Sequence, residues 1–216
     1  NGNLIIKNSN IFFKNLDNEV LFINKALKLK YYFDHKEFKN IFYSENKIFN
    51  IPFSFNSFFS EDKNSFFSQI NLNLMKIKNE NELNFENQKK IGKSKLIFNK
   101  IKRNLKYQIK KNSVDFHIFN KTDEPDINYK GNLNFKPFYG NLDGDLIEIN
   151  LNSLFGSNAV IAQLLKTEIF NNKNIDFKIN IHADKVYKNS NFKNINLSSN
   201  LQEGLIDTDN TKFKWR

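Results

Sequence analysis

The chain has 216 residues and a formal net charge of +10, with 33 Lys and Arg against 23 Asp and Glu. It contains no cysteine, which excludes disulfides, cysteine-based zinc sites and thiol catalysis. The many lysines occur together with many Asn, Ile and Phe, the residues of A/T-rich codons, and they are scattered along the chain. We therefore expect a solvated surface and no nucleic-acid partner.

The length suits one continuous β-rich module over residues 1–216, with possible sub-modules at 1–121 and 126–216. The chain opens with Asn and reads as strand at both ends, so we expect a piece of a longer polypeptide. No apolar run approaches the ~18 residues that span a bilayer. A membrane anchor or signal peptide is therefore expected outside this sequence.

The first half of the chain alternates apolar and polar residues in short runs, which predicts a series of antiparallel strands. Residues 4–33 predict three or four strands separated by Asn-rich turns, and 91–120 predict a meander of three. Between them, Ser44–Lys47 is predicted as a turn. Pro52 follows it in an alternating run, and because proline lacks an N–H, its strand is predicted either to lie at an edge or to start there.

The second half contains the one predicted helix. Asp143-Gly144 is the strongest hairpin signal, because glycine readily adopts the positive φ of a tight turn. Apolar residues at helical spacing then predict an amphipathic helix over residues 157–170, with Ser157 as its cap. From Ile175 to Ile181 the period changes to two, which predicts a strand with one apolar face.

We find no chemical motif that predicts catalysis. The three histidines, His35, His117 and His182, have no partner at the spacing of metal ligands. The segment around Asp143 fails the calcium-loop pattern, because Tyr139 would occupy the first ligand position. We predict no catalytic residue, no cofactor and no metal site.

These patterns predict a mainly β protein: a long, antiparallel, strongly curved sheet that forms an open groove or a partly closed barrel. A closed sandwich core is the alternative reading of the same alternation. If the sheet stays open, its apolar face can line a lipid groove; the candidates are Leu133, Phe135, Ile147, Ile149, Phe177, Ile179, Ile181, Ile195 and Leu197. The helix residues predicted to cover an end or opening are Val160, Ile161, Leu164, Leu165 and Ile169.

The order of features in the last ninety residues resembles the AsmA-like proteins of Gram-negative envelopes, relatives of TamB and YhdP. The similar stretches are Gly131–Phe135, Gly144–Leu151, the helix through Ala159–Ile169, Ile179–Ala183, Asn191–Leu197 and Gln202–Ile206. Residues 5–13, 23–31 and 49–53 are similar to an upstream module of the same family. The resemblance lies in hydrophobicity and turns.

The resemblance implies a non-enzymatic, periplasmic β-groove related to the bridge-like lipid transfer proteins. Its implied partners are phospholipid or another lipid, the inner membrane through a segment outside this sequence, and outer-membrane or envelope proteins. The implied role is to carry phospholipid acyl chains between the inner and outer membranes, or to assist envelope assembly. The alternative is a closed β-sandwich or β-solenoid that serves as an adhesion or scaffolding module.

Overall fold

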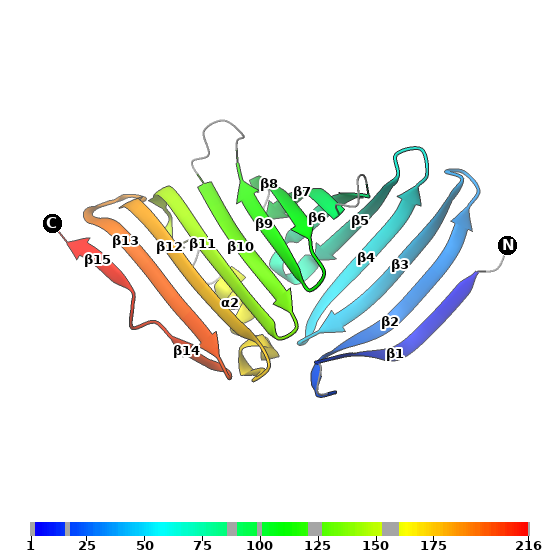
Figure 1. Cartoon of the computed structure of the whole chain (residues 1–216), viewed down its shortest axis with the longest axis horizontal. Helices are drawn as coiled ribbons and strands as arrows, with labels where there is room; N and C mark the ends of the chain where they lie inside the picture. The colour runs from blue at the N-terminus through cyan, green and yellow to red at the C-terminus, as the bar shows by residue number, and fades with distance from the viewer. Residues whose placement is uncertain are drawn as a thin grey trace. The chain divides into compact units, whose positions relative to one another are not determined.

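The structure is a computed structural model that describes residues 3–15, 18–85, 90–98, 101–120, 127–152 and 160–215. It is mainly β, as predicted: the strands form one open sheet in which β1 to β14 follow each other in chain order and β15 pairs with β13 (Figure 1). The contacts divide the chain into two units, residues 1–109 and 110–216. The predicted sub-module boundary at 121–126 lies within the second unit.

Unit 1 is an antiparallel meander in which each strand pairs with its neighbour in sequence. Its elements are β1 (Leu4–Lys14), β2 (Val20–Asp34), β3 (Lys39–Ile48), β4 (Ile51–Ser60), β5 (Ser65–Leu72), the 3₁₀ turn η1 (Asn73–Met75), β6 (Ile77–Asn84), β7 (Lys90–Phe98) and β8 (Ile101–Ile109).

Unit 2 adds a helical segment between two of its strands. Its described elements are β9 (Ser113–Phe119), β10 (Ile127–Phe135), β11 (Phe138–Ile149), the helix α2 (Val160–Leu164), the 3₁₀ turn η3 (Glu168–Asn171), β12 (Asp176–Val186), β13 (Asn189–Gln202), β14 (Leu205–Asp207) and β15 (Lys212–Trp215).

Three local predictions are wrong. Residues 4–33 contribute to two strands, β1 and β2, and not to three or four, because residues 8–10 continue β1 and do not form a turn. Ser44–Lys47 lies within β3, and the chain reverses instead at Phe49 and Asn50, which both have positive φ. Asp143-Gly144 lies in the middle of β11, and the hairpin before it turns at Lys136-Pro137, closed by the pair Phe135 and Phe138. Gly144 serves a packing function there, described below.

Pro52 lies at the second position of β4, opposite Lys47 of β3. Pairing of β4 with β5 starts only at Ser54, so the missing N–H of Pro52 removes no hydrogen bond from that ladder. The prediction that a strand starts near Pro52 is confirmed, although β4 is an interior strand of the sheet.

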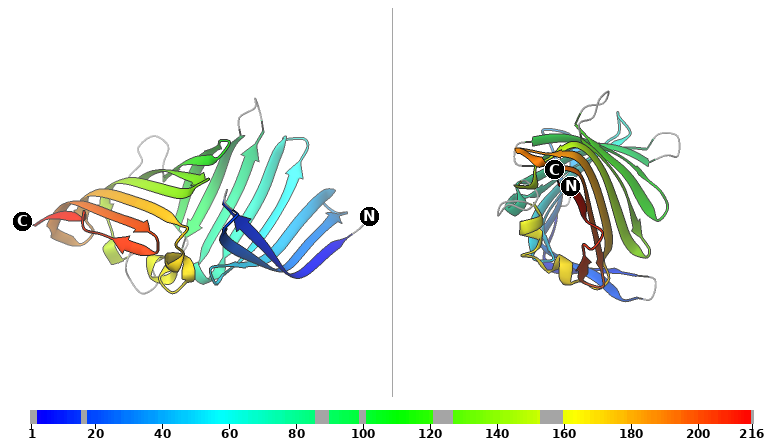
Figure 2. Two further views of the ribbon diagram at one scale, coloured as in Figure 1. Left: turned by 60° about the horizontal axis from the view of Figure 1, so that its bottom comes forward. Right: turned by 90° about the vertical axis from the view of Figure 1, so that its left-hand side faces the viewer.

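The sheet departs from a fully antiparallel arrangement at one place among its described pairings, because β11 and β12 run parallel. Parallel neighbours require the chain to return to the same end of the sheet, so they need a long crossover. Residues 150–175 supply it, and they include α2 and η3. Figures 1 and 2 show both helical elements on one side of the strands of unit 2.

The α-helix ends earlier than the predicted residue 170. The α-helix ends at Leu164, whose carbonyl accepts hydrogen bonds from both the N–H and the hydroxyl of Thr167. Thr167 is extended, and its hydroxyl oxygen then accepts a hydrogen bond from the N–H of Ile169 at the start of η3. Thr167 thus separates α2 from η3 within the predicted helix, while the predicted cap Ser157 lies outside the described residues.

No helix in the described ranges is both long enough and apolar enough to cross a membrane.

Candidate functional site

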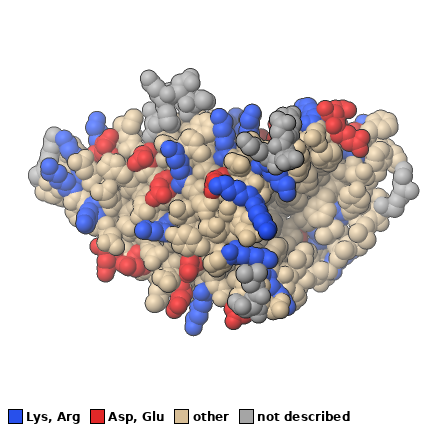
Figure 3. Space-filling view, viewed as in Figure 1, with Lys and Arg blue, Asp and Glu red and all other residues tan. Residues whose placement is uncertain are grey.

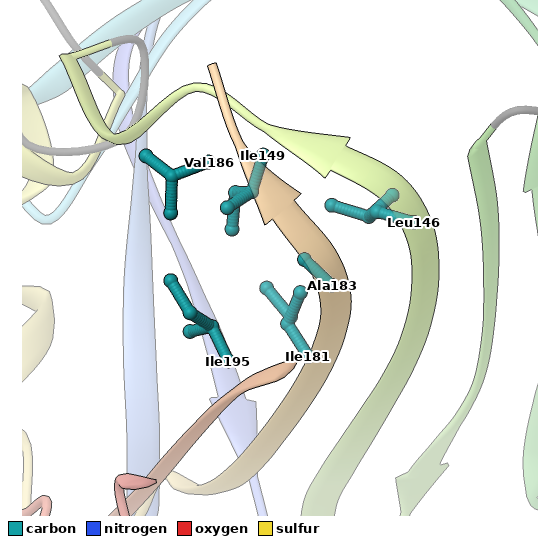
Figure 4. Close-up of a cluster of buried hydrophobic side chains, with 6 residues drawn as sticks. All are labelled: Leu146, Ile149, Ile181, Ala183, Val186 and Ile195. Atoms are coloured by element: carbon teal, nitrogen blue, oxygen red, sulfur yellow. The ribbon is translucent and has the colours of Figure 1, made fainter. Parts of the chain in front are cut away.

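The main apolar core of unit 2 is a cluster on β11, β12 and β13. It consists of Leu146, Ile149, Ile181, Ala183, Val186 and Ile195. Ala183 is completely buried and Ile149 is only 2% exposed. Figure 4 shows the six side chains projecting to the concave side of these curved strands.

The strand registers extend this cluster into a wider surface, because directly paired residues project from the same face of a sheet. Four rows cross β10 to β13: Ile127–Leu146–Ala183–Ile195, Tyr129–Gly144–Ile181–Leu197, Gly131–Leu142–Ile179–Ser199 and Leu133–Gly140–Phe177–Leu201. None of these residues is charged. We call this surface of unit 2 the apolar face.

Glycines of the apolar face hold aromatic rings flat against the sheet. A Cβ on Gly144 would lie 2.5 Å from Cδ1 of Tyr129, its partner on β10. A Cβ on Gly140 would likewise overlap the ring of Phe177, its partner on β12. The rings therefore occupy the space that a side chain would need, and this explains why glycine occurs inside β11.

The opposite surface of unit 2 is covered by polar and charged side chains that bond to one another across strands. Asn180 donates from Nδ2 to Oδ1 of Asp143 at 2.9 Å and accepts at Oδ1 from the hydroxyl of Ser198 at 3.1 Å. His182 Nδ1 lies 2.8 Å from Oδ1 of Asn196. Figure 3 shows Lys, Arg, Asp and Glu distributed over β9 to β13 on this surface. We call it the polar face, and in Figure 1 α2 lies behind it.

The polar face carries a carboxyl group with a shifted pKa. Lys110 forms an ion pair and hydrogen bond with Asp115, and Asn132 donates to the same side chain from Nδ2. First the lysine and then the amide hold the pKa of Asp115 below its usual range. Both partners stabilise the ionised carboxylate.

The structure brings together most of the predicted groove residues. The residues of this set on the apolar face are Leu133, Phe177, Ile179, Ile181, Ile195 and Leu197, and Ile149 belongs to the buried cluster. Ile147 does not join them, since it is 53% exposed and lies outside the cluster. Phe135 lies at the turn end of β10 and is also exposed.

The predicted covering helix contributes less than expected. Ile161, Leu164 and Ile169 are half-buried, whereas Leu165 is 58% exposed. These residues are not among the side chains that pack against the buried cluster. Of the crossover residues that the structure describes, Leu151 does pack against it. The side chain of Val160 lies outside the described part of the structure.

Unit 1 has a corresponding surface with a different composition. Its rows combine aromatic and aliphatic residues with Ser, Asn and, at the end of the second row, Arg103. Two of the rows are Tyr31–Phe42–Ser57–Ser68–Asn81–Ser94–Leu105 and Leu29–Ser44–Phe55–Ile70–Asn79–Leu96–Arg103. We call it the mixed face. The reverse side of the same strands carries charges, including Lys28, Glu45, Glu80, Lys93 and Lys95.

The polar residues of the mixed face bond to one another. Asn46 donates from Nδ2 to the hydroxyl of Ser44 at 2.6 Å. Tyr107 donates its hydroxyl hydrogen to Oδ1 of Asn81 at 2.7 Å, and Asn81 donates from Nδ2 to Ser68 at 3.2 Å. Burial raises the pKa of Tyr107, and its hydrogen bond to Asn81 opposes this shift.

Two clefts of unit 2 are lined mainly by polar residues. One, of about 550 Å³, is lined by Tyr139, Lys178, Asn200, Gln202 and other polar residues. A second, of about 400 Å³, shares Ser198 and Asn210 with it and is lined mainly by residues of the polar face. The second cleft also includes Gly144, Ile181 and Leu197 of the apolar face. The residues in the four rows of that face are buried or half-buried, and none of them is exposed.

Sequence reasoning did not identify Gly140, Gly144, Leu142 or Ala183 as part of this surface. Their placement depends on which residues are paired across strands, and the sequence does not state the register. The available signal was the occurrence of glycines within alternating runs, which indicates close approach of another group.

No protein-family model, curated protein or solved structure matches the chain. Among the described residues, no group of three or more His, Asp or Glu side chains is arranged to hold a metal ion.

Proposed function

We propose that the chain is a non-enzymatic lipid-binding module whose apolar face contacts acyl chains during lipid transfer. One observation carries the proposal. Four uncharged rows cross β10 to β13 on the concave side of a sheet whose edges are open. Such a surface can bind an apolar ligand of variable length, because its contacts are not directional.

The exposed area of the chain is larger than that of compact domains of the same mass. The chain exposes 14618 Å². Two separate compact domains, each of half its mass, would together expose about 12,500 Å². A single layer of sheet has more surface than a compact two-layer domain, and this contributes to the excess.

The free-energy cost of moving an acyl chain through water explains how such a surface would assist lipid transfer. Moving a chain of ~15 methylenes through water would cost on the order of 12 kcal/mol, at ~0.8 kcal/mol per methylene. Contact with a continuous apolar surface removes much of that cost. The absence of charge from the four rows is important, since an unpaired charge would require its own solvation near the chain.

The open sheet argues against the closed-sandwich alternative. A closed core would need a second layer or a pairing between the first and last strands of the sheet. The pairing order instead ends at β1 and at β14. An adhesion or scaffolding role for the polar face would leave the uncharged rows of the apolar face without an explanation.

We further propose the setting implied by the resemblance to AsmA-like proteins. In it the module works in the periplasm of a Gram-negative bacterium, joined to the inner membrane by a segment outside this sequence. It passes phospholipid toward the outer membrane, with envelope proteins as partners. The support for this setting is the order of strands, turns and helix along the chain.

A pair of substitutions on β12 and β13 tests lipid binding. Ile179→Asp places a carboxylate on the apolar face, whereas Asn200→Asp places the same charge on the polar face, opposite Lys178. With a fluorescently labelled phospholipid, we expect Ile179→Asp to weaken binding roughly tenfold, about 1.4 kcal/mol, and Asn200→Asp to change it little.

A neutral variant tests whether a loss of lipid binding is caused by misfolding. Leu142→Gln removes apolar surface from the same row without adding charge, and circular dichroism reports whether the sheet is intact. Equal binding by the wild type, Ile179→Asp and Leu142→Gln would reject the apolar face as the lipid site, as would no binding by the wild type.

A further inference from the structure

The positive charge of the chain is divided unequally between its two units. Residues 1–109 contain 19 Lys and Arg against 10 Asp and Glu, whereas residues 110–216 contain 14 against 13. Use of A/T-rich codons affects the whole chain, so it does not explain why unit 1 carries nearly all of the net charge. A charge asymmetry of this kind indicates an anionic partner for the basic unit.

The strand registers gather lysines of unit 1 on the side opposite the mixed face. Three rows cross β6, β7 and β8 there: Lys78–Ile97–Lys102, Glu80–Lys95–Asn104 and Glu82–Lys93–Lys106. Five of these nine residues are lysines and two are glutamates. We call the five lysines the lysine patch.

The matching surface of unit 2 has no such excess. Two lysines and two aspartates occur among the nine residues in three rows of the polar face on β10, β11 and β12, which are Asn128–Asp145–His182, Lys130–Asp143–Asn180 and Asn132–Asn141–Lys178. The lysine patch is therefore a local feature of unit 1 and not a general property of the polar surface of this sheet.

Two lysines of the patch oppose each other directly. Lys93 of β7 is paired with Lys106 of β8, and both residues are exposed. Like charges directly opposite each other destabilise a strand pair. An anion bound between them would relieve this repulsion, so the arrangement favours an anionic ligand.

The other lysines of the patch act together on one carboxyl group. Lys78 bonds to Glu80 at 2.6 Å and is the largest cause of the lowered pKa of that side chain. Lys95 and Lys102 lower the same pKa further. The patch spans roughly 10 Å across three strands and roughly 13 Å along them, which is close to the ~8 Å over which salt screens a charge. Its charges therefore produce one continuous positive potential.

The lysine patch continues into an aromatic pair on the same side of the sheet. Glu82 is paired with Phe67, and Phe67 with Phe58, and the two rings stack with centroids 5.1 Å apart. Lys39 Nζ lies 4.4 Å from the ring centroid of Phe58, and Lys63 Nζ lies 5.6 Å from that of Phe67. Basic and apolar residues on one surface are typical of proteins that bind at a membrane interface.

A lipid bilayer fits the patch better than a nucleic acid does. The lysines are spread over two dimensions, as are the head groups of a bilayer, whereas a nucleic-acid backbone presents its charge along a line. Arginine is better suited than lysine to hold individual phosphates in a fixed geometry. Arg103, the arginine of β8, projects instead from the mixed face.

We propose that the lysine patch binds the anionic surface of a phospholipid bilayer, so that this side of unit 1 lies on the membrane. The attraction is electrostatic and acts on lipid head groups, whereas the apolar face of unit 2 is proposed to contact acyl chains. The patch therefore binds its ligand independently of the apolar face, and either proposal can fail without the other.

Co-sedimentation with phospholipid vesicles tests the patch. At about 0.1 M salt, we expect the wild type to bind vesicles of equal parts phosphatidylglycerol and phosphatidylcholine at least about tenfold more tightly than vesicles of phosphatidylcholine alone. Binding to the anionic vesicles should fall steeply as salt is added. Binding through the apolar face would instead persist with phosphatidylcholine and at high salt.

Matched double variants locate the binding surface. Lys93→Gln/Lys106→Gln should weaken binding to the anionic vesicles roughly tenfold or more, and it removes a repelling pair, so the fold should remain stable. Lys130→Gln/Lys178→Gln removes the same charge from the polar face of unit 2 and should change binding less than about twofold. Lys93→Arg/Lys106→Arg retains the charge and should bind like the wild type.

Three outcomes would overturn the proposal. One is equal binding of the wild type to anionic and to phosphatidylcholine vesicles. Another is an equal loss of binding in the two glutamine variants, which would show that net charge acts without a defined surface. The third is binding of the wild type to a DNA duplex but not to anionic vesicles, which would assign the patch to a nucleic acid.

Discussion

The apolar face of unit 2 and the mixed face of unit 1 are built on similar strands but are held by different interactions. In unit 2, aliphatic side chains pack beside aromatic rings that lie against glycines, and Ala183 and Ile149 are almost completely buried. In unit 1, serine and asparagine lie among the phenylalanines and bond across strands, as Asn81 does with Ser68 and Tyr107.

This difference shows what the alternation of apolar and polar residues determines. It determines which residues share a face of the sheet, but not whether packing or hydrogen bonding holds that face together. Both units alternate with a period of two, and both place most of their charged residues on one side of the sheet, although Arg103 lies on the mixed face opposite Leu96. The apolar face loses stability when volume is removed or added, whereas the mixed face loses stability when a hydrogen-bond partner is removed. We therefore expect the two faces to respond to different substitutions.

The largest effect is expected from Ile149→Ala in the cluster of unit 2. Ile149 is 2% exposed, so the truncation leaves a cavity and should lower the free energy of unfolding by about 2–5 kcal/mol. Ile147→Ala, two residues away on β11 and 53% exposed, should change it by less than about 0.5 kcal/mol. Denaturant unfolding followed by Trp215, the single tryptophan, reports on unit 2. Equal losses would show that the cluster is not a core.

The next largest effect on stability is expected where the ring of Tyr129 packs on Gly144. Gly144→Ala forces the ring of Tyr129 away from the sheet and should destabilise unit 2 by about 1–3 kcal/mol. Tyr129→Ala removes the ring, so Gly144→Ala should cost much less in that background. A double-mutant cycle measures this coupling. Additive losses would contradict the seating of Tyr129 on Gly144.

The mixed face provides the contrasting prediction. Asn81→Leu leaves the half-buried hydroxyl of Tyr107 without its acceptor and should cost about 1–2 kcal/mol in thermal or denaturant unfolding of unit 1. Adding Tyr107→Phe removes the second partner and should recover part of that loss. If the double variant is less stable than Asn81→Leu, the hydrogen bond is not what holds this face together.

The smallest effect is the pH dependence of Asp115 on the polar face. Its pKa is lowered in the folded protein, so its contribution to stability is present above the unfolded pKa of about 3.9 and is lost as the pH falls below it. Because the pair is exposed, the contribution is at most about 1 kcal/mol. Asp115→Asn should be less stable than the wild type at pH 7, and the difference should shrink toward pH 3. A difference that grows on acidification would contradict this assignment.

Much of the strand content could be predicted because the chain alternates apolar and polar residues almost throughout. Local residue preferences failed where packing across strands determined the structure. Asp143-Gly144 resembles a turn locally, yet Gly144 lies within β11 because Tyr129 covers it. The parallel pairing of β11 and β12 likewise depends on a crossover whose endpoint the sequence does not reveal.

The candidate site was predictable to the extent that it follows alternation on a single strand. Phe177, Ile179 and Ile181 share a face for that reason. Ile147 was placed among them by the same rule, but it is exposed, while the adjacent Leu146 belongs to the buried cluster. Which of two adjacent apolar residues faces the core depends on the register with neighbouring strands, and that information is not local.

Lipid contact can be measured most directly with a photo-cross-linking amino acid at two adjacent positions of β12. Position 179 lies on the apolar face, and position 178 lies on the polar face. After illumination with phospholipid vesicles, mass spectrometry of the protein should show a lipid adduct at position 179 and little or none at position 178. Equal adducts at the two positions, or adducts confined to position 178, would contradict the proposal that the apolar face binds acyl chains.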